Sequence, residues 1–446
     1  MIWFKIHFLL GYKGYPTFTH APLGGTGQSS MEKNRYQPVI TGLGIVAPIG
    51  VGVDAFWESA SAGRSGIGWL TQYDASSLPR PCQIVGEVRD FVSRDWMGGI
   101  AGRMAGRFSQ FAVATCRMAV AEAGLHEAGM PPERIKVSFG SSMSGVVHIQ
   151  EPTFTAFLRG EKVVPWTVLE YSTHAATSHV SAEAGALGHP TSFATACCAG
   201  LDAVAWAADQ VGRGDAVAAI AGATDTPLSP YTLTAFHSSG TLSTWEGAPE
   251  EASRPFEHSR SGLVLAEGAA TVVVEDYANA LSRGIPIYAR VLGFGSSSEG
   301  GELRTVDESG EAAGRAMAMA IRDAGLSSED IDYICAHGNS MINYDIAETA
   351  GIKLALGKQA GSVPISSIKS MCGHALGAAG AMQVVTACLA IRHGIVPPTI
   401  NYEERDPRCD LDYVPNVARR ARINNVLVHS HSIGGTHMAL VLGTPN

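Results

Sequence analysis

Short apolar runs alternate with longer stretches of helical periodicity along most of the chain. Short buried runs separated by helices are typical of strands in an α/β sheet. In the first half the pattern predicts strands at 39–50, 134–143 and 216–222 and one strongly apolar helix at 201–211. With the helical pattern before 134 included, this half reads strand, helix, strand, helix, strand, and we expect its strands to form a buried parallel sheet.

The second half of the chain repeats this plan. The counterparts of the first-half elements are 289–298, 331–341, 378–392 and 426–434, and in both halves a helical pattern ends in Ala-Gly-Leu, at 123–125 and 324–326. Such a repeat predicts two similar halves related by a pseudo-twofold axis. Strand ends and helix starts of both halves should then meet in the middle, where α/β folds place their active sites. We set the boundaries at 1–36, 37–285 and 286–446.

Composition narrows the possible classes of protein. The 446 residues are 46% apolar and 16% charged, with a net charge of −9. This excludes a disordered chain, which needs low hydrophobicity and high charge, and argues against a nucleic-acid binder, which needs a basic excess. No apolar run reaches the ~18 residues of a membrane span. The 51 glycines, the many small apolar residues and the low charge predict a large core and an oligomer.

The cysteines and the first residues indicate a cytoplasmic protein. None of the eight cysteines forms a CxxC pair or a zinc-like spacing, so we predict reduced thiols and no metal site. Lys5 and His7 interrupt the apolar start, which is unlike a signal peptide, and 1–30 contains no arginine, which is unlike a mitochondrial presequence. We expect Met31 to be the working start, or 1–30 to be a loose and poorly ordered extension.

Cys197 is the first candidate for chemistry. It lies between a strand-like run and the apolar helix 201–211, and its small neighbours permit a sharp turn. A cysteine at a helix N-terminus gains from the helix dipole and is expected to have a lowered pKa. Cys198 fits the same position almost equally well, and a buried structural thiol is the alternative for either residue.

Two histidines in the second half are the other candidates. His337 ends a predicted strand, and His374 precedes a predicted helix, where the dipole keeps the ring neutral. A neutral imidazole can donate a hydrogen bond to a developing oxyanion. Lys369 adds a positive charge five residues before His374. Taken alone, each histidine fits an ordinary core or surface position as well as a catalytic one. The duplication, however, places both histidines at the same end of the fold as Cys197.

These motifs resemble those of the β-ketoacyl-[acyl-carrier-protein] synthases of the thiolase superfamily, most closely the elongating synthase II type. The resemblance runs from about Pro38 to the C-terminus and rests on Thr195–Cys197, His337–Gly338 and Lys369–His374. Supporting stretches are 253–256, 262–268, 373–380, 397–401, 409–415 and 434–436. The resemblance implies an α/β, thiolase-like, five-layered α-β-α-β-α sandwich built from two duplicated halves. It also implies a homodimer.

The resemblance further implies a decarboxylative Claisen condensation. Cys197 would take an acyl chain from an acyl carrier protein, and His337 and His374 would assist decarboxylation of malonyl-carrier protein and stabilise the enolate. The backbone N–H groups of Cys197 and Ile433 would form the oxyanion hole. The substrates are carried on the phosphopantetheine of the acyl carrier protein, so no separate cofactor is expected. The family's supporting polar network matches Lys369, Asp345 and Glu348, which we expect to pair with one another.

Several positions depart from the family pattern. Asn339 and Met341 stand where the family has threonines that bind the pantetheine arm. In the C-terminal loop, Ile433 replaces a gating Phe, and Ser432 replaces a Gly that lets the gate swing. Met143 falls at the deep end of the family's acyl pocket, where it would limit chain length or be ordinary core. These changes affect substrate choice and gating, but not the Cys-His-His set.

Two further groups of residues carry weaker signals. His429, His431 and His437 resemble a metal-binding strand, but no carboxylate or cysteine has a matching spacing, so we interpret them as a partly exposed loop. Arg103 and Arg107, four residues apart, would share a helical face and dock the acidic carrier protein, or they are ordinary solvated charges.

The residues leave two main functions open. The first is 3-oxoacyl-carrier-protein synthesis in fatty acid elongation. The second is a specialised ketosynthase of a type II polyketide or modified-lipid pathway, working with a partner subunit that lacks the cysteine. A non-catalytic chain-length partner is disfavoured because Cys197, His337 and His374 are all present.

Overall fold

The computed structural model describes residues 36–303 and 305–445, without the side chains of residues 100, 101 and 103. The predicted extension, 1–36, therefore lies outside the described residues except for Tyr36. In the described part of the chain, no helix is both long and apolar enough to cross a bilayer.

The first half contributes five strands in the order β6-β5-β7-β8-β1. Their bounds are β1 (Pro38–Ala47), β5 (Ile135–Gly140), β6 (Pro190–Phe193), β7 (Ala218–Asp225) and β8 (Gly268–Asp276). β5 runs parallel to β6 and β7, whereas β8 runs antiparallel to both β7 and β1. All ten residues of β1 are buried, as expected for a strand covered on both faces.

The second half repeats this order as β11-β10-β14-β15-β9. The bounds are β9 (Ala289–Ser298), β10 (Tyr333–Cys335), β11 (Ile365–Ser366), β14 (Asn425–His431) and β15 (Thr436–Gly443). Again the first two pairings are parallel and the next two antiparallel. A short pairing of β1 with β9 joins the halves. The expected duplication is therefore confirmed, but a wholly parallel sheet is wrong, because β14 turns straight back into β15 through a tight hairpin.

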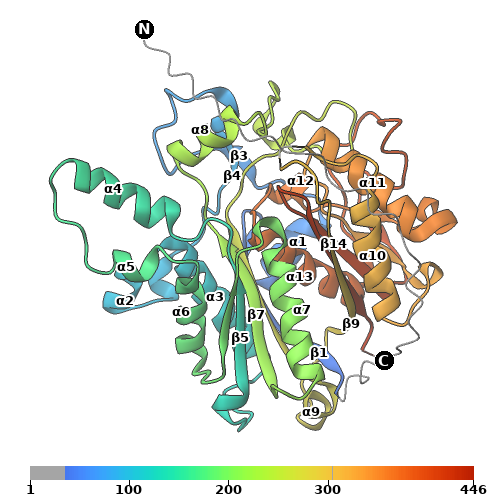
Figure 1. The fold of residues 1–446 in the computed structure, drawn as a ribbon, viewed down its shortest axis with the longest axis horizontal. Coiled ribbons are helices and arrows are strands. Elements are labelled where there is room, and N and C mark those ends of the chain that lie inside the picture. The colour runs from blue at the N-terminus through green and yellow to red at the C-terminus, as the bar shows by residue number, and fades with distance from the viewer. Residues whose placement is uncertain (1–35, 304, 446) are drawn as a thin grey trace, which may run out of the picture. The chain divides into compact units, whose positions relative to one another are not determined.

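The sheets and helices stack in five layers, as Figure 1 shows. α3 (Arg107–Glu122) and α6 (His174–Ala184) cover the outer face of the first half, and α10 (Glu311–Asp323) and α11 (Ile342–Leu356) cover that of the second. Between the halves lie α7 (Ala199–Gly212) and α13 (Ala378–His393). α13 is buried nearly all round, which is typical of a central helix.

Close packing of α7 against α13 brings the two halves together at the helix starts. A Cβ on Gly200 would lie 2.5 Å from the backbone nitrogen of Ala381, and one on Gly380 would lie 2.9 Å from that of Leu201. Only glycine permits so close an approach. The contact places the turn before α7 beside the turn before α13, which are the segments that carry Cys197 and His374.

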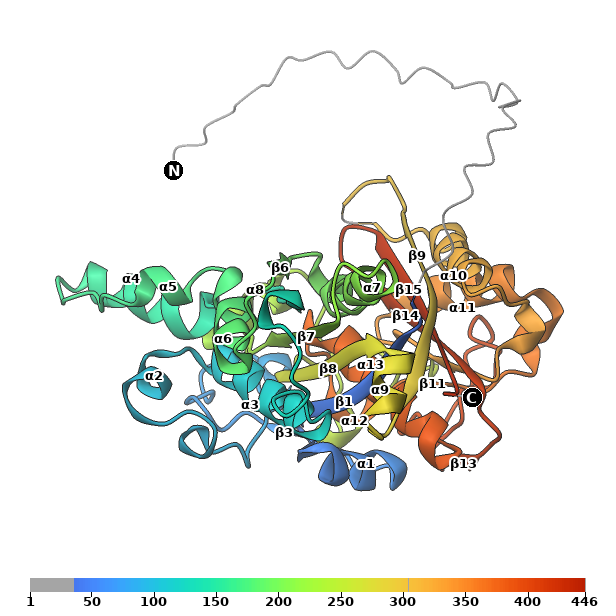
Figure 2. The same cartoon turned by 90° about the horizontal axis from the view of Figure 1, so that it is seen from below.

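Shorter elements surround this core. They are β2 (Gly50–Val51), α1 (Val53–Ser61), β3 (Ile67–Trp69), β4 (Ile84–Gly86), α2 (Gly99–Met104), α4 (Glu151–Leu158), α5 (Thr167–Glu170), α8 (Pro230–Ser238), α9 (Tyr277–Ser282), α12 (Lys369–Cys372), β12 (Ile395–Val396) and β13 (Arg419–Arg420). Figures 1 and 2 show α4 and α5 standing out beyond α6, at the end of the sheet that β6 borders.

Candidate active site

Cys197 lies on a sharp turn between β6 and α7. A short 3₁₀ turn, Ala196–Cys198, joins the strand to the helix, and Ala196 takes a positive φ of 49°. A non-glycine residue in this conformation is uncommon, and such strain concentrates at functional sites. The turn leaves the side chain of Cys197 3% exposed, in an apolar cluster that includes Leu228 and Leu376.

The neighbouring cysteine has a different environment. The Sγ of Cys198 donates to the carbonyl oxygens of Ser430, at 3.5 Å, and Thr436, at 3.4 Å. Burial raises its pKa strongly. These contacts direct Cys198 toward the β14–β15 hairpin as a structural thiol, so the geometry favours Cys197 as the nucleophile.

The thiol of Cys197 is not acidified, contrary to expectation. Burial raises its pKa to about 11, although the charge of Lys369 and the backbone N–H groups of Ile433 and Cys197 all act to lower it. Desolvation of the thiolate therefore outweighs the helix N-terminus. The same two N–H groups are the predicted oxyanion hole.

This pKa predicts how Cys197 reacts with an alkylating agent. Its rate of modification by iodoacetamide should rise about tenfold per pH unit from pH 7 to 10, because only the thiolate reacts. A plateau near pH 9, as for a thiol with the ordinary pKa of about 8.5, would contradict the buried environment. Peptide mass spectrometry at each pH measures the rate, with Cys197→Ala as the background control.

His337 and His374 come together as predicted. Their ring centroids lie 5.2 Å apart with the planes at 85°, and the residues are 1% and 2% exposed. Burial and then the Lys369 charge lower the pKa of each ring well below its usual value. Both imidazoles are therefore neutral at neutral pH, and Nδ1 of each has no hydrogen-bond partner among the described residues.

Asn339 sets the tautomer of His337. Its Oδ1 accepts from the backbone N–H of Met341 at 3.0 Å, so its Nδ2 must be the atom that lies 3.2 Å from Nε2 of His337. A neutral ring that accepts at Nε2 carries its proton on Nδ1. Asn339 thus leaves His337 with a buried, unpaired Nδ1–H, which is the kind of donor that a developing oxyanion requires.

Lys369 supports the histidines through the backbone rather than through ion pairs. Its Nζ donates to the carbonyl oxygen of His337 at 2.5 Å and to Oε1 of Gln383 at 3.3 Å. Burial lowers its pKa. The predicted pairing with Asp345 and Glu348 is wrong, because both carboxylates take other partners.

Glu348 and Asp345 shape the His337 loop from α11. Glu348 accepts the N–H groups of His337 and Gly338, each at 2.7 Å, and also Nδ1 of His429 at 2.6 Å. Burial alone would raise the pKa of Glu348, but these donors, His429 foremost, lower it. Asp345 accepts from the N–H of Asn339 and pairs with Arg260 at 3.3 Å. Burial still raises its pKa to about 7.

The loop 432–435 closes over Cys197 as the hairpin between β14 and β15. Ser432 keeps a negative φ, and its Oγ donates to the carbonyl oxygen of Thr195 at 2.9 Å. A glycine could not make this bond, so Ser432 fastens the hairpin to the nucleophile turn. The side chain of Ile433 is 47% exposed.

A cavity of about 830 Å³ opens beside this hairpin. Its lining includes Met341, Tyr344, Leu303, Thr241 and Ile433. Met341 also packs at the edge of the apolar cluster around Cys197, as does Met143. Met341 and Ile433 thus line a cavity beside the apolar cluster around Cys197, whereas Asn339 is 3% exposed and faces His337 instead.

The chain matches two family models whose ranges contain Cys197, His337, Lys369 and His374. "Beta-ketoacyl synthase, N-terminal domain" matches residues 37–280, and "Beta-ketoacyl synthase, C-terminal domain" matches residues 288–403. The chain belongs to the β-ketoacyl synthase family. It is therefore a condensing acyltransferase, which forms carbon–carbon bonds.

Curated relatives divide between two kinds of pathway. The chain is 40% identical to 3-oxoacyl-[acyl-carrier-protein] synthase 2 of Coxiella burnetii, covering 92% of this chain and 99% of that protein. It is also 40% identical to the tetracenomycin polyketide synthase ketoacyl synthase alpha subunit of Streptomyces glaucescens, covering 91% and 97%.

Solved structures agree on the fold. A ketosynthase in complex with its type II polyketide acyl carrier protein, bound to the hexaketide, matches with a TM-score of 0.85 and 32% identity, covering 92% of this chain and 99% of that chain. The ishigamide ketosynthase/chain length factor matches with a TM-score of 0.85 and 31% identity over the same shares. These matches confirm the thiolase-like sandwich of this β-ketoacyl synthase.

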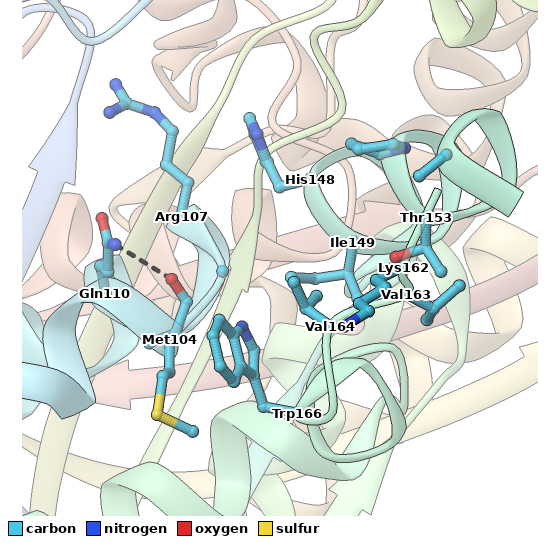
Figure 3. Close-up of a pocket in the computed structure, with 14 residues that line it drawn as sticks. Met104, Arg107, Gln110, His148, Ile149, Thr153, Lys162, Val163, Val164 and Trp166 are labelled. Atoms are coloured by element: carbon cyan, nitrogen blue, oxygen red, sulfur yellow. Dashed lines mark hydrogen bonds between the residues drawn. The ribbon is translucent and has the colours of Figure 1, made fainter. Parts of the chain in front are cut away.

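Arg103 and Arg107 do not lie on one helix, as the sequence predicted. Arg103 lies in α2, with its side chain outside the described part, and Arg107 begins the separate helix α3. The guanidinium of Arg107 binds both carboxylate oxygens of Glu267, at 2.7 and 2.8 Å. Figure 3 shows Arg107 and His148 on one side of a cavity of about 500 Å³, with Trp166 on the other. Arg107 is thus committed to Glu267.

Sequence reasoning missed several buried residues around the site. Asp225, at the end of β7, accepts from the N–H groups of Met143 and Gly377 and so ties the two halves together. The three C-terminal histidines are wholly buried, so their interpretation as a partly exposed loop is wrong. The carboxylate beside them is Glu299, which follows β9. Only the duplication could have placed the end of β9 next to β15.

Proposed function

We propose that this enzyme is a 3-oxoacyl-[acyl-carrier-protein] synthase that extends an acyl chain in fatty acid synthesis. The observation that carries the proposal is the buried Cys197 on its strained turn, which lies beside the turn that carries His374. The backbone N–H groups of Ile433 and Cys197 both act to lower the pKa of this thiol. His337 and His374 stand in the same buried site as neutral rings. A soft nucleophile beside neutral donors suits thioester condensation better than hydrolysis.

The reaction follows from these groups. Cys197 attacks the acyl thioester of a carrier protein, and the carrier thiol leaves with the proton of Cys197. Malonyl-carrier protein then loses CO₂, while His337 and His374 donate to the enolate oxygen. The enolate carbon attacks the acyl-Cys197 carbonyl, whose oxygen lies between the two N–H groups. The carbon–carbon bond forms, the carbon–sulfur bond breaks, and the product is a 3-oxoacyl-carrier protein. No separate cofactor is needed for these steps.

A second function is a ketosynthase subunit of a type II polyketide or modified-lipid pathway. It is favoured by the altered hairpin, in which Ser432 fastens the loop to Thr195 and Ile433 borders the cavity beside it. One solved relative is a ketosynthase/chain length factor, and another is bound to its carrier protein. By analogy we expect an acyl carrier protein as the substrate carrier.

A product assay tests the proposal and separates its two versions. The enzyme is incubated with malonyl-carrier protein and a series of acyl-carrier proteins from C2 to C16, and the extended 3-oxoacyl product is identified by mass. Extension of long saturated chains supports fatty acid elongation. Extension of short or oxo chains alone supports the second function. Free fatty acid in place of any extended product would contradict both.

The exposed apolar residues of α4 and α5 support a partner subunit. Phe157, Leu158, Val168 and Leu169 are each 66–69% exposed. They lie beyond α6 near β6, which is the last strand on its side of the sheet. Apolar patches and free strand edges mark interaction sites. We propose that a second copy of the chain binds here, the alternative being a chain-length partner.

Charge placed in this patch should therefore break the dimer. Leu169→Glu combined with Phe157→Glu should shift the protein from dimer to monomer in light scattering, because the interface would bury two carboxylates. Leu281→Glu on α9, where the side chain is 61% exposed, is the matched control and should stay dimeric. A wild-type protein that is monomeric without any partner would contradict the homodimer.

A further inference from the structure

Three side chains outside the condensing machinery converge beneath the hairpin. Glu299 follows β9, His431 ends β14, and His437 lies in β15. Oε1 of Glu299 lies 3.2 Å from Nε2 of His431 and 3.1 Å from Nε2 of His437. The two histidines are each 1% exposed, and the side chain of Glu299 is 7% exposed.

A chain of hydrogen bonds fixes which nitrogen of His437 faces Glu299. Nδ1 of His429 lies 2.6 Å from Oε1 of Glu348, and its Nε2 lies 3.3 Å from Nδ1 of His437. This leaves Nε2 of His437 as the ring nitrogen that faces Oε1 of Glu299, at 3.1 Å.

His431 adds an independent sign of a missing ligand. Neither of its ring nitrogens has a hydrogen-bond partner within the described part of the chain, although the residue is buried. Buried ring nitrogens without partners are rare in native proteins. The ring stacks on His437 with centroids 3.9 Å apart, and its Nε2 lies 3.2 Å from the same oxygen of Glu299 without the alignment of a hydrogen bond.

We propose that Glu299, His431 and His437 bind a divalent transition-metal ion, with zinc as the ion that fits best. The three ligand atoms lie within 4.8 Å of one another. Around a tetrahedral zinc with bonds of about 2.0–2.1 Å, neighbouring ligand atoms lie about 3.3 Å apart, close to the two measured separations. Two imidazoles and a carboxylate are a recognised donor set for zinc.

The surrounding contacts support this site. Metal-bound histidines usually donate their other N–H to a partner that leads to a carboxylate. Here Nδ1 of His437 lies 3.3 Å from Nε2 of His429, whose Nδ1 lies 2.6 Å from Oε1 of Glu348. Oε2 of Glu299 accepts from the N–H of Asp307 at 3.2 Å, which leaves Oε1 for the ion.

The ion would join the three strands around the hairpin. Glu299 follows β9, while His431 and His437 pair with each other across β14 and β15 at the base of the hairpin that carries Ile433. The rings of His431 and His337 lie 6.1 Å apart. The role that follows is structural: the ion holds the hairpin in place beside the site and does not touch Cys197.

Metal binding by the full-length protein tests the proposal. Bound metal is first removed with EDTA. After zinc is added and the excess is dialysed away, we expect about one zinc per chain to remain bound. With Co²⁺ in place of zinc, we expect the visible absorption of tetrahedral cobalt. Glu299→Gln and His437→Asn should each weaken binding about 10–100-fold or more. His148→Gln, at a partly buried histidine outside this cluster, should bind like the wild type.

Thermal unfolding of the wild type gives a second measurement that needs no variant. Zinc should raise the midpoint, since an ion that binds only the folded state stabilises it, and magnesium should not. Less than a tenth of an equivalent of zinc, or equal binding by Glu299→Gln, would overturn the proposal and leave a proton as the bridging cation. Acyl loading of Cys197 is measured separately and does not enter this test.

Discussion

Cys197→Ala is expected to abolish condensation, lowering turnover by about 10³-fold or more, as found when a catalytic nucleophile is removed. Alanine cannot form the acyl thioester, so the predicted oxyanion hole, the N–H groups of Cys197 and Ile433, would have no acyl carbonyl to stabilise. The side chain is small and buried, so the fold should tolerate the change. Turnover is measured as 3-oxoacyl product from acyl- and malonyl-carrier protein.

Cys198→Ala is the matched control for this prediction. Cys198 is equally buried but donates to the carbonyl oxygens of Ser430 and Thr436. Its loss should cost about 1 kcal/mol of stability and leave turnover within a few-fold of the wild type. If Cys198→Ala were the inactive variant and Cys197→Ala the active one, the assignment of the nucleophile would be reversed.

His374→Ala is expected to lower condensation by about 10²–10³-fold, the usual loss when one oxyanion donor is removed. His374 is neutral and buried, and its ring stands edge-on to that of His337. His374 stabilises the enolate formed from malonyl-carrier protein and takes no part in acyl transfer to Cys197. Acyl loading of Cys197 should therefore continue at close to the wild-type rate.

Separate measurement of the two half-reactions checks this division. Loading is followed by intact mass, and decarboxylation by release of labelled CO₂ from malonyl-carrier protein. We expect His374→Ala to load the acyl chain and release little CO₂. A variant that fails to load but still decarboxylates would place His374 on the acyl side of the site.

The central residues could be predicted because local sequence determines them. Cys197 and His374 both precede a helix that follows an apolar strand, and the internal repeat places these turns at the same end of the fold. In the structure, the close contact at Gly200 and Gly380 holds these two turns side by side. A layered sandwich of two halves followed from the repeat and its five layers from the resemblance, but the antiparallel strands β8 and β15 followed from neither.

The remaining errors concern partners that only the folded chain brings together. Lys369 binds a backbone carbonyl, and Arg107 binds Glu267, which lies far along the chain. Glu299 reaches His431 and His437 across the sheet. The pKa of Cys197 was misjudged for a related reason, because burial depends on every layer of the sandwich and not on the helix start alone.

The most direct test of the account is to locate the acyl group. The enzyme is incubated with acyl-carrier protein alone, its intact mass is measured, and the modified peptide is sequenced by mass spectrometry. We predict one acyl group per chain, attached to Cys197, and none on Cys197→Ala. An acyl group on Cys198 or another residue, or no acyl enzyme while extended product still forms, would contradict the account.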